Sequence, residues 1–109
     1  MKPMGYERYK YSGDVYKYVR KIVGDTSELK YYFAGSISIR VGTDKTQRTI
    51  IHSEEPLELG TIISNIKDAN GNLILENTNW QINNLQPIFN AFGTVESYRM
   101  AATKYQGTL

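Results

Sequence analysis

The chain has 109 residues, enough for one domain, and its 40% hydrophobic content with 9 Gly and 3 Pro is typical of a globular protein. It contains no Cys, which excludes disulfides, thiolate catalysis and cysteine-based metal sites. No apolar run reaches the roughly 18 residues of a membrane span, and the start MKPMGYERYKYSG lacks the apolar core of a signal peptide. We therefore expect a soluble protein with no membrane contact, used in the cytoplasm or in a particle assembled there.

The net charge of +2 is unevenly distributed along the chain. Residues 1–48 carry ten Lys or Arg against five Asp or Glu, whereas residues 49–109 carry three against six. Such asymmetry can indicate a face for nucleic acid or another charged partner. Strands that interleave in space would instead average the charge over the surface, and the sequence leaves both interpretations open.

The first half of the chain has strand patterns and lacks an apolar stripe of helical period. After a predicted N-terminal arm (1–12), residues 14–23 are rich in Tyr and Val, which favour strands. GDTSEL (24–29) predicts a turn. A second strand over 31–41 ends in clean alternation, and a further turn follows at 42–45.

The second half continues with short strands separated by turn residues. SEEPLELG (53–60) is a connection, the Asn-Gly pair within 67–72 predicts a tight turn, and NAFG (90–93) separates the last two strands. Pro87 lacks an N–H, so it predicts an edge or a bulge. The remaining predicted strands are 47–52, 61–66, 73–75, 79–89 and 94–105, followed by a tail at 105–109.

Six or seven short antiparallel strands at this spacing predict an all-β fold, a small barrel or sandwich that spans residues 13–104 between extended termini. Alternation and the position of the single Trp indicate its interior. The predicted core comprises Ile37, Ile39, Val41, Ile62, Trp80, Ile82, Leu85, Phe89, Val95 and Tyr98.

Nothing in the sequence indicates an enzyme. The only His, His52, ends an apolar strand and is expected to be structural. The pair Glu54 and Glu55 precedes a Pro and has no His or Cys near it to complete a metal site. There is no phosphate-binding Gly-rich loop and no nucleophile elbow. We expect no catalytic residues, no metal and no cofactor.

Nine Tyr residues are many for a chain of this length. Tyr is enriched at protein interfaces because it combines a large apolar area with a polar tip. Tyr beside Lys and Arg is also what a binder of single-stranded nucleic acid uses, and half-buried strands favour Tyr for packing alone. The candidate interface residues are Tyr6, Tyr9, Tyr11, Tyr16, Tyr18 and Tyr105.

Four motifs between residues 57 and 105 carry a family resemblance. They are LELGTII, DANGNL, NWQINNLQP and NAFGTVESYRM, and together they resemble the stopper or head-closure group of head-tail connector proteins of tailed bacteriophages. The resemblance implies a β-barrel without catalytic residues, located in the virion. It also implies a homo-oligomeric ring between the portal or adaptor and the tail, which lines or gates a channel for double-stranded DNA.

A gating role needs a polar loop between strands, and two segments qualify. The first, VGTDKTQR (41–48), contains Asp44 together with Lys45 and Arg48, and these two cations are suited to DNA phosphates. Like the second segment, it also fits an ordinary surface loop. The second segment, 52–60, carries Glu54, Glu55 and Glu58, which would repel DNA and let it slide.

Two other functions remain open from the sequence. One is a small β-barrel that binds single-stranded nucleic acid through Tyr9, Tyr11 and Tyr16 with neighbouring cations. The other is a module for carbohydrate or a host receptor that uses Trp80 and exposed Tyr. The first would place several of the N-terminal Tyr side chains on one open face.

Overall fold

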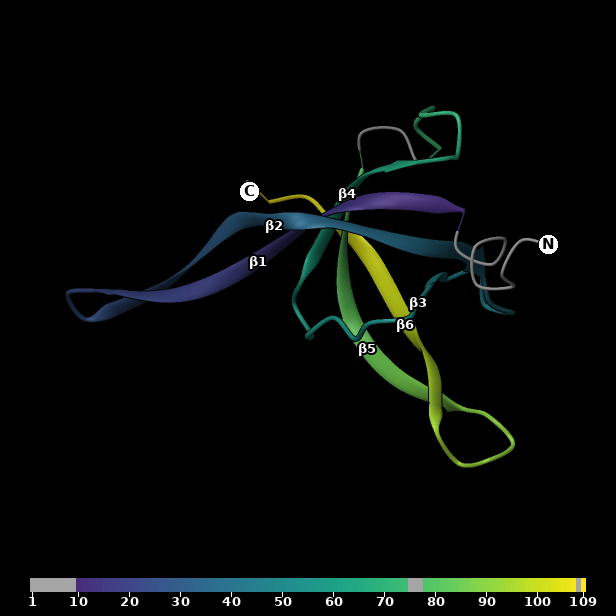
Figure 1. Cartoon of the computed structure of the whole chain (residues 1–109). Helices are drawn as coiled ribbons and strands as arrows, with labels where there is room; N and C mark the ends of the chain where they lie inside the picture. Colours follow the sequence, from purple (N-terminus) through teal and green to yellow (C-terminus); the bar gives the residue numbers. More distant parts are fainter. Residues whose placement is uncertain (1–9, 75–77, 108) are drawn as a thin grey trace.

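The computed structural model describes residues 10–74, 78–107 and 109, and within them the protein is all-β, as predicted, with no helix. The predicted interface residues Tyr6 and Tyr9 lie outside the described residues. The strands form one closed barrel in the order β1-β2-β3-β6-β5-β4, all antiparallel (Figure 1). They are β1 (Tyr11–Val23), β2 (Thr26–Thr43), β3 (Thr49–Ser53), β4 (Ile62–Lys67), β5 (Asn79–Phe89) and β6 (Val95–Tyr105).

The strands and the limits of the barrel differ from the prediction in several places. β1 begins at Tyr11 and β6 ends at Tyr105, so the barrel includes residues that we had placed in the terminal arm and tail. The predicted strand 73–75 is wrong as far as it is described, since Leu73 makes only an isolated bridge to Lys67. The predicted turn at 24–29 is also wrong, because only Gly24 and Asp25 separate β1 from β2.

The barrel interior is filled mainly by β-branched side chains, which pack well on a pleated surface. Of the predicted core residues, Ile39, Ile62, Trp80 and Ile82 are buried, which confirms them. Three more are half-buried and pack against the core, Ile37, Val41 and Leu85, and Tyr98 is also half-buried. The complete buried apolar set is Val15, Ile39, Ile50, Ile51, Leu57, Ile62, Ile63, Ile66, Trp80, Ile82, Met100, Ala101 and Ala102.

Two core predictions are wrong. Phe89 is 58% exposed and Val95 is 38% exposed. Their strands alternate correctly, but the segment that carries them continues past the barrel, where no second layer covers either face. Alternation therefore identified a face that the fold leaves in solvent.

Two hairpins project from the barrel. The first is the distal part of the β1–β2 hairpin, residues 16–33, which we call the long hairpin (Figure 1). Eight residue pairs run from Tyr16↔Phe33 to Val23↔Thr26, a ribbon about 25 Å long. It closes through a two-residue turn in which Gly24 has a φ of 61°, a conformation that Gly adopts at no steric cost.

A bulge marks the point where the long hairpin leaves the barrel. Val15 pairs with Gly35 and the next residue, Tyr16, pairs with Phe33, so Ala34 has no partner on β1. Gly35 has a φ of 127°, and such a bulge bends its strand. The pairing of β1 with β4 also ends at Tyr16, so the ribbon beyond it has two unpaired edges.

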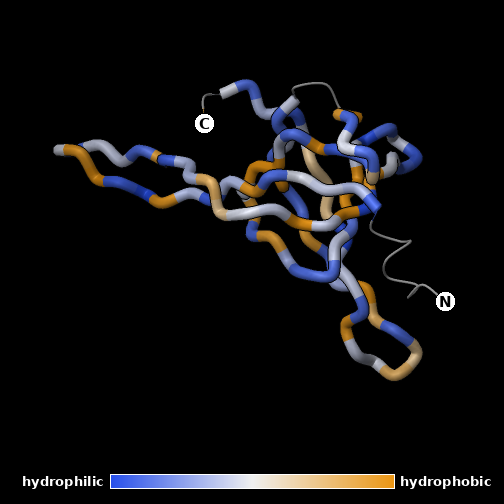
Figure 2. Tube along the Cα trace, turned by 45° about the horizontal axis from the view of Figure 1, so that its top comes forward, coloured by the Kyte–Doolittle hydropathy of each residue, from blue (hydrophilic) through white to orange (hydrophobic). Residues whose placement is uncertain are grey.

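The second projection is the end of the β5–β6 hairpin (Figures 1 and 2). The pairing of β5 with β4 involves only Trp80 and Gln81, so the distal part of β5 is bonded to β6 alone. Pro87 lies in this part, which confirms the predicted edge position. The chain measures 56 × 35 × 29 Å along its principal axes because the two hairpins extend in different directions.

Candidate interaction surfaces

A cluster of three tyrosines joins the base of the long hairpin to the barrel. The rings of Tyr18 and Tyr31 meet edge to face with centroids 5.9 Å apart, and Tyr31 meets Tyr105 in the same way at 5.6 Å. The Tyr31 hydroxyl accepts a hydrogen bond from Gln81 Nε2 at 3.3 Å. Burial is the largest effect on Tyr31 and raises the pKa of its hydroxyl, so this hydroxyl keeps its proton at neutral pH.

The same tyrosines anchor the connection that leads into β4. The Tyr18 hydroxyl donates to the Leu59 carbonyl at 3.1 Å, and the Tyr31 hydroxyl donates to the Gly60 carbonyl at 3.3 Å. Gly60 in turn donates its N–H to the Ile82 carbonyl on β5 at 2.7 Å. The connection is thereby fixed both to the hairpin base and to the barrel wall.

The predicted interface tyrosines are therefore dispersed. Tyr18 and Tyr105 are bonded within the chain, and Tyr11 packs against the core. Tyr16 meets Phe33 edge to face at 5.7 Å across the start of the long hairpin. Stacking on single-stranded nucleic acid requires several aromatic side chains on one open face. The described N-terminal tyrosines do not share such a face.

The long hairpin carries exposed apolar side chains that the sequence did not reveal, because a strand pattern does not show whether another layer covers the strand. Cross-strand partners share a face of a ribbon. One face holds Ile22, Leu29 and Phe33 with few charges, and Ile22 is 76% exposed. The opposite face holds the exposed residues Lys17, Val19, Lys21, Val23, Glu28, Lys30 and Tyr32.

The tip of the β5–β6 hairpin, residues 89–95, displays a second apolar group (Figure 2). Phe92 is 92% exposed and is flanked by the exposed Phe89 and Val95. The turn beneath it is ordered by Asn90, whose Oδ1 accepts from Phe92 N at 2.9 Å and from Thr94 N at 3.1 Å. This Asx turn holds Phe92 in solvent on a defined backbone.

The loop that we expected to be polar and flexible at 41–48 is bonded to itself. Asp44 Oδ1 accepts from Thr46 N and Arg48 N, both at 2.9 Å, and Oδ2 accepts from Arg48 Nε at 2.9 Å. These bonds hold the pKa of Asp44 well below its usual range. Arg48 is paired with Asp44 through Nε while its side chain stays 57% exposed, and Lys45 is exposed as well.

The second predicted channel segment, which we call the acidic connection (residues 54–60), is also held in place. The Ser53 hydroxyl donates to the Glu55 carbonyl, Leu57 is buried in the core, and Thr61 N donates to the Glu58 carbonyl at 3.1 Å. Glu54, Glu55 and Glu58 all remain exposed. Their three carboxylates lie on an ordered segment of the surface.

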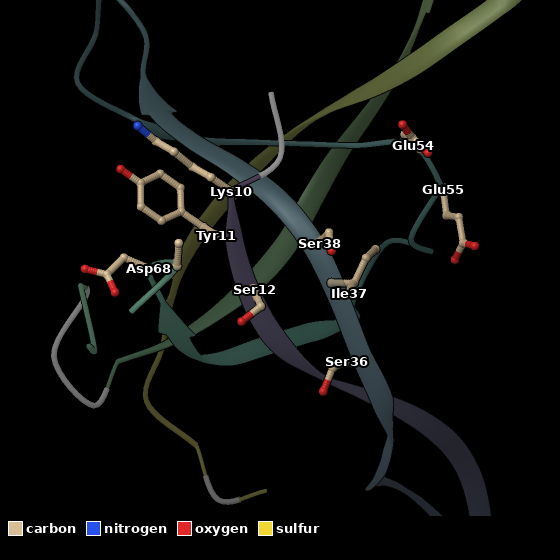
Figure 3. Close-up of a pocket in the computed structure, with 10 residues that line it drawn as sticks. Lys10, Tyr11, Ser12, Ser36, Ile37, Ser38, Glu54, Glu55 and Asp68 are labelled. Carbon is tan, nitrogen blue, oxygen red and sulfur yellow. The ribbon is translucent and has the colours of Figure 1, made fainter. Parts of the chain in front are cut away.

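A pocket of about 650 Å³ lies between the start of β1, the middle of β2 and the acidic connection (Figure 3). Glu54 and Glu55 lie on the far side of β2 from Asp68 and Tyr11 in this view, so the acids do not converge. Asp68 Oδ1 accepts from Asn70 N at 2.8 Å and from Asn72 N at 3.0 Å, bonds that lower its pKa. The pocket lining is Lys10, Tyr11, Ser12, Ser36, Ile37, Ser38, Glu54, Glu55, Asp68 and Ala69.

The described residues offer no metal centre, since no three His, Cys, Asp or Glu side chains gather in them. His52 lies on β3 beside Arg40, whose Nη2 is 3.4 Å from the His52 Nδ1. Within the described residues there is no helix long and apolar enough to cross a membrane. No protein-family model, curated protein or solved structure matches the chain.

Proposed function

We propose that this protein is a structural component of a phage head-tail connector, where it assembles as a ring between the portal or adaptor and the tail. The observation that carries the proposal is the pair of projecting hairpins with exposed apolar side chains. A two-stranded ribbon is marginally stable by itself in water, and exposed apolar patches on ordered backbone are typical of protein interfaces.

The size of these surfaces fits an assembly role. A Phe side chain buries 150–250 Å² when covered, so Phe89 and Phe92 together offer on the order of 300 Å² at one tip. A standard interface buries about 800 Å² from each partner. The tip therefore suits the apolar centre of an interface whose rim is polar.

The two surfaces lie on different hairpins of the same chain, so one copy can contact two neighbours at once in a head-to-tail association. Such heterologous contacts generate a ring when the rotation closes. The barrel then holds the two hairpins in fixed directions, and the assembled ring lines or gates a channel for double-stranded DNA. The resemblance over residues 57–105 supports the same role.

The experiment is to inactivate the gene in the phage that encodes this protein and to add the purified protein back. We expect separate heads and tails, or heads that lose their DNA, and restoration of infectious particles by the wild-type protein. Electron microscopy of the restored particles would locate the ring. Normal tailed particles in the absence of the protein would refute the proposal, and tight, salt-sensitive binding to single-stranded oligonucleotides would favour the nucleic-acid alternative instead.

A further inference from the structure

We propose that the long hairpin of one copy docks on the acidic connection of a second copy of this chain. The inference rests on the proposed ring and names its contact. The occupant is a second copy because the described chain displays both a basic apolar ribbon and an acidic apolar surface that complement each other in charge.

The charges of the two surfaces are opposite. The long hairpin, residues 16–33, carries four Lys or Arg against two Asp or Glu, a net of +2. Three of these cations, Lys17, Lys21 and Lys30, are exposed on one face of the ribbon. The acidic connection carries three exposed Glu and no cation, a net of −3. Complementary charges of this kind steer partners together and fix their register.

The apolar parts also correspond. Leu59 on the acidic connection is 54% exposed, and its backbone carbonyl accepts the hydrogen bond from the Tyr18 hydroxyl. The long hairpin offers a matching apolar set on the same face as its lysines, Val19, Val23 and Tyr32, which are 52%, 49% and 47% exposed. A ribbon about 25 Å long can span a surface of this kind, with its charged face toward the carboxylates.

A chain cannot satisfy this contact with its own hairpin. The Tyr18 hydroxyl fixes Leu59 beside the hairpin base, and from that point the ribbon runs away from the barrel (Figure 1). The two surfaces therefore meet only between copies. When each copy offers its hairpin to one neighbour and its acidic connection to another, the association is head to tail and can close into a ring.

The first test measures self-association by analytical ultracentrifugation at several protein and salt concentrations. We expect assembly that strengthens with protein concentration and weakens with salt. The variant K17E/K21E and the variant E54K/E55K should each associate about tenfold more weakly than wild type, and an equimolar mixture of the two should recover association, because each hairpin then meets opposite charge on its partner. The matched control K45E/K104E reverses two exposed lysines outside the contact and should behave as wild type.

The second test places the contact directly and uses the absence of Cys in the wild-type chain. A copy with Val23→Cys, on the lysine face of the hairpin, mixed with a copy with Leu59→Cys should form a heterodimer with a short bismaleimide. A mixture of Val23→Cys with Lys104→Cys should not. These positions are exposed, so the variants are expected to fold.

Three outcomes would overturn the inference. They are a wild-type protein that stays monomeric up to about 1 mM at low salt, charge-reversal variants that fail to recover when mixed, and cross-linking no better than the Lys104 control. Each is separable from failure of the proposed function, because restoration of infectious particles is scored independently of which surfaces meet. A ring that joins heads to tails without this cross-link would retain the function and refute the contact.

Discussion

Gly13 is the position where a single methyl group should most clearly test the packing of the barrel. Gly13 lies on β1 at an irregularity of the β1–β4 pairing, between Ser12↔Lys67 and Asp14↔Ser64. A Cβ at Gly13 would lie 2.6 Å from Ile63 Cγ2. Favourable carbon–carbon contacts are about 3.5–4.0 Å, so the wall must move by roughly 1 Å. Ile63 is fully buried and cannot swing into solvent.

The magnitude of the Gly13→Ala effect follows from two opposing contributions. Overpacking a filled interior costs about 1–3 kcal/mol. The loss of unfolded-chain freedom on Gly→Ala returns about 0.4–1 kcal/mol. We therefore expect Gly13→Ala to lower the free energy of unfolding by roughly 1–2 kcal/mol, a decrease in Tm of roughly 5–15 °C for a domain of this size.

Urea unfolding followed by the fluorescence of Trp80 measures this change, because Trp80 is the only Trp and is buried in the core. Gly42→Ala on β2 is the matched control, since a Cβ there would have no neighbour within 4 Å and its φ is not positive. It should leave stability unchanged or slightly raised. Equal free energies of unfolding for the Gly13 and Gly42 variants would refute the packing argument.

Three further predictions concern the connection, the tip and the acid-sensitive loop. Gly60→Ala, with a φ of 92° and a new Cβ 2.9 Å from Tyr18 Cε1, should lower the free energy of unfolding by about 1–3 kcal/mol in urea titrations. Phe92→Ser should leave that free energy within about 0.5 kcal/mol, because Phe92 is solvent-exposed, while sedimentation velocity should show weaker self-association. The pKa of Asp44 is lower in the folded state, so its contribution is complete above about pH 4 and is lost as the pH falls through the folded pKa. Asp44→Asn should therefore be less stable than wild type at pH 7, with the difference narrowing in urea titrations at pH 3 and below.

Much of the fold is determined by local pattern. Alternating β-branched residues define strands and their inward faces, which is why Ile39 and Ile82 could be placed in the core from sequence alone. Pro87 could be placed at an edge because it has no N–H to donate. The all-β class follows from the same regular spacing of strands and turns.

The two projections could not be derived in the same way. Alternation shows which side chains share a face, but whether another layer covers that face depends on where strands pair, and this is a long-range property. The pairing of β4 with β1 ends at Tyr16 and its pairing with β5 involves only Trp80 and Gln81, so the ends of β1 and β5 beyond those points have no cover from β4. Phe89 has the sequence pattern of a core residue and the environment of a surface one.

The same distinction between local pattern and long-range pairing applies to the candidate surfaces. The sequence by itself determined that the chain is rich in Tyr, basic in its first half and acidic around residue 55. Only the tertiary structure decided that Tyr18 is used internally and that Arg48 is paired with Asp44. Only the tertiary structure, likewise, placed Ile22 and Phe92 in solvent. The physical reason is that charge and side-chain type are local properties, whereas exposure is set by barrel closure, which brings distant segments together and leaves the ends of two hairpins outside.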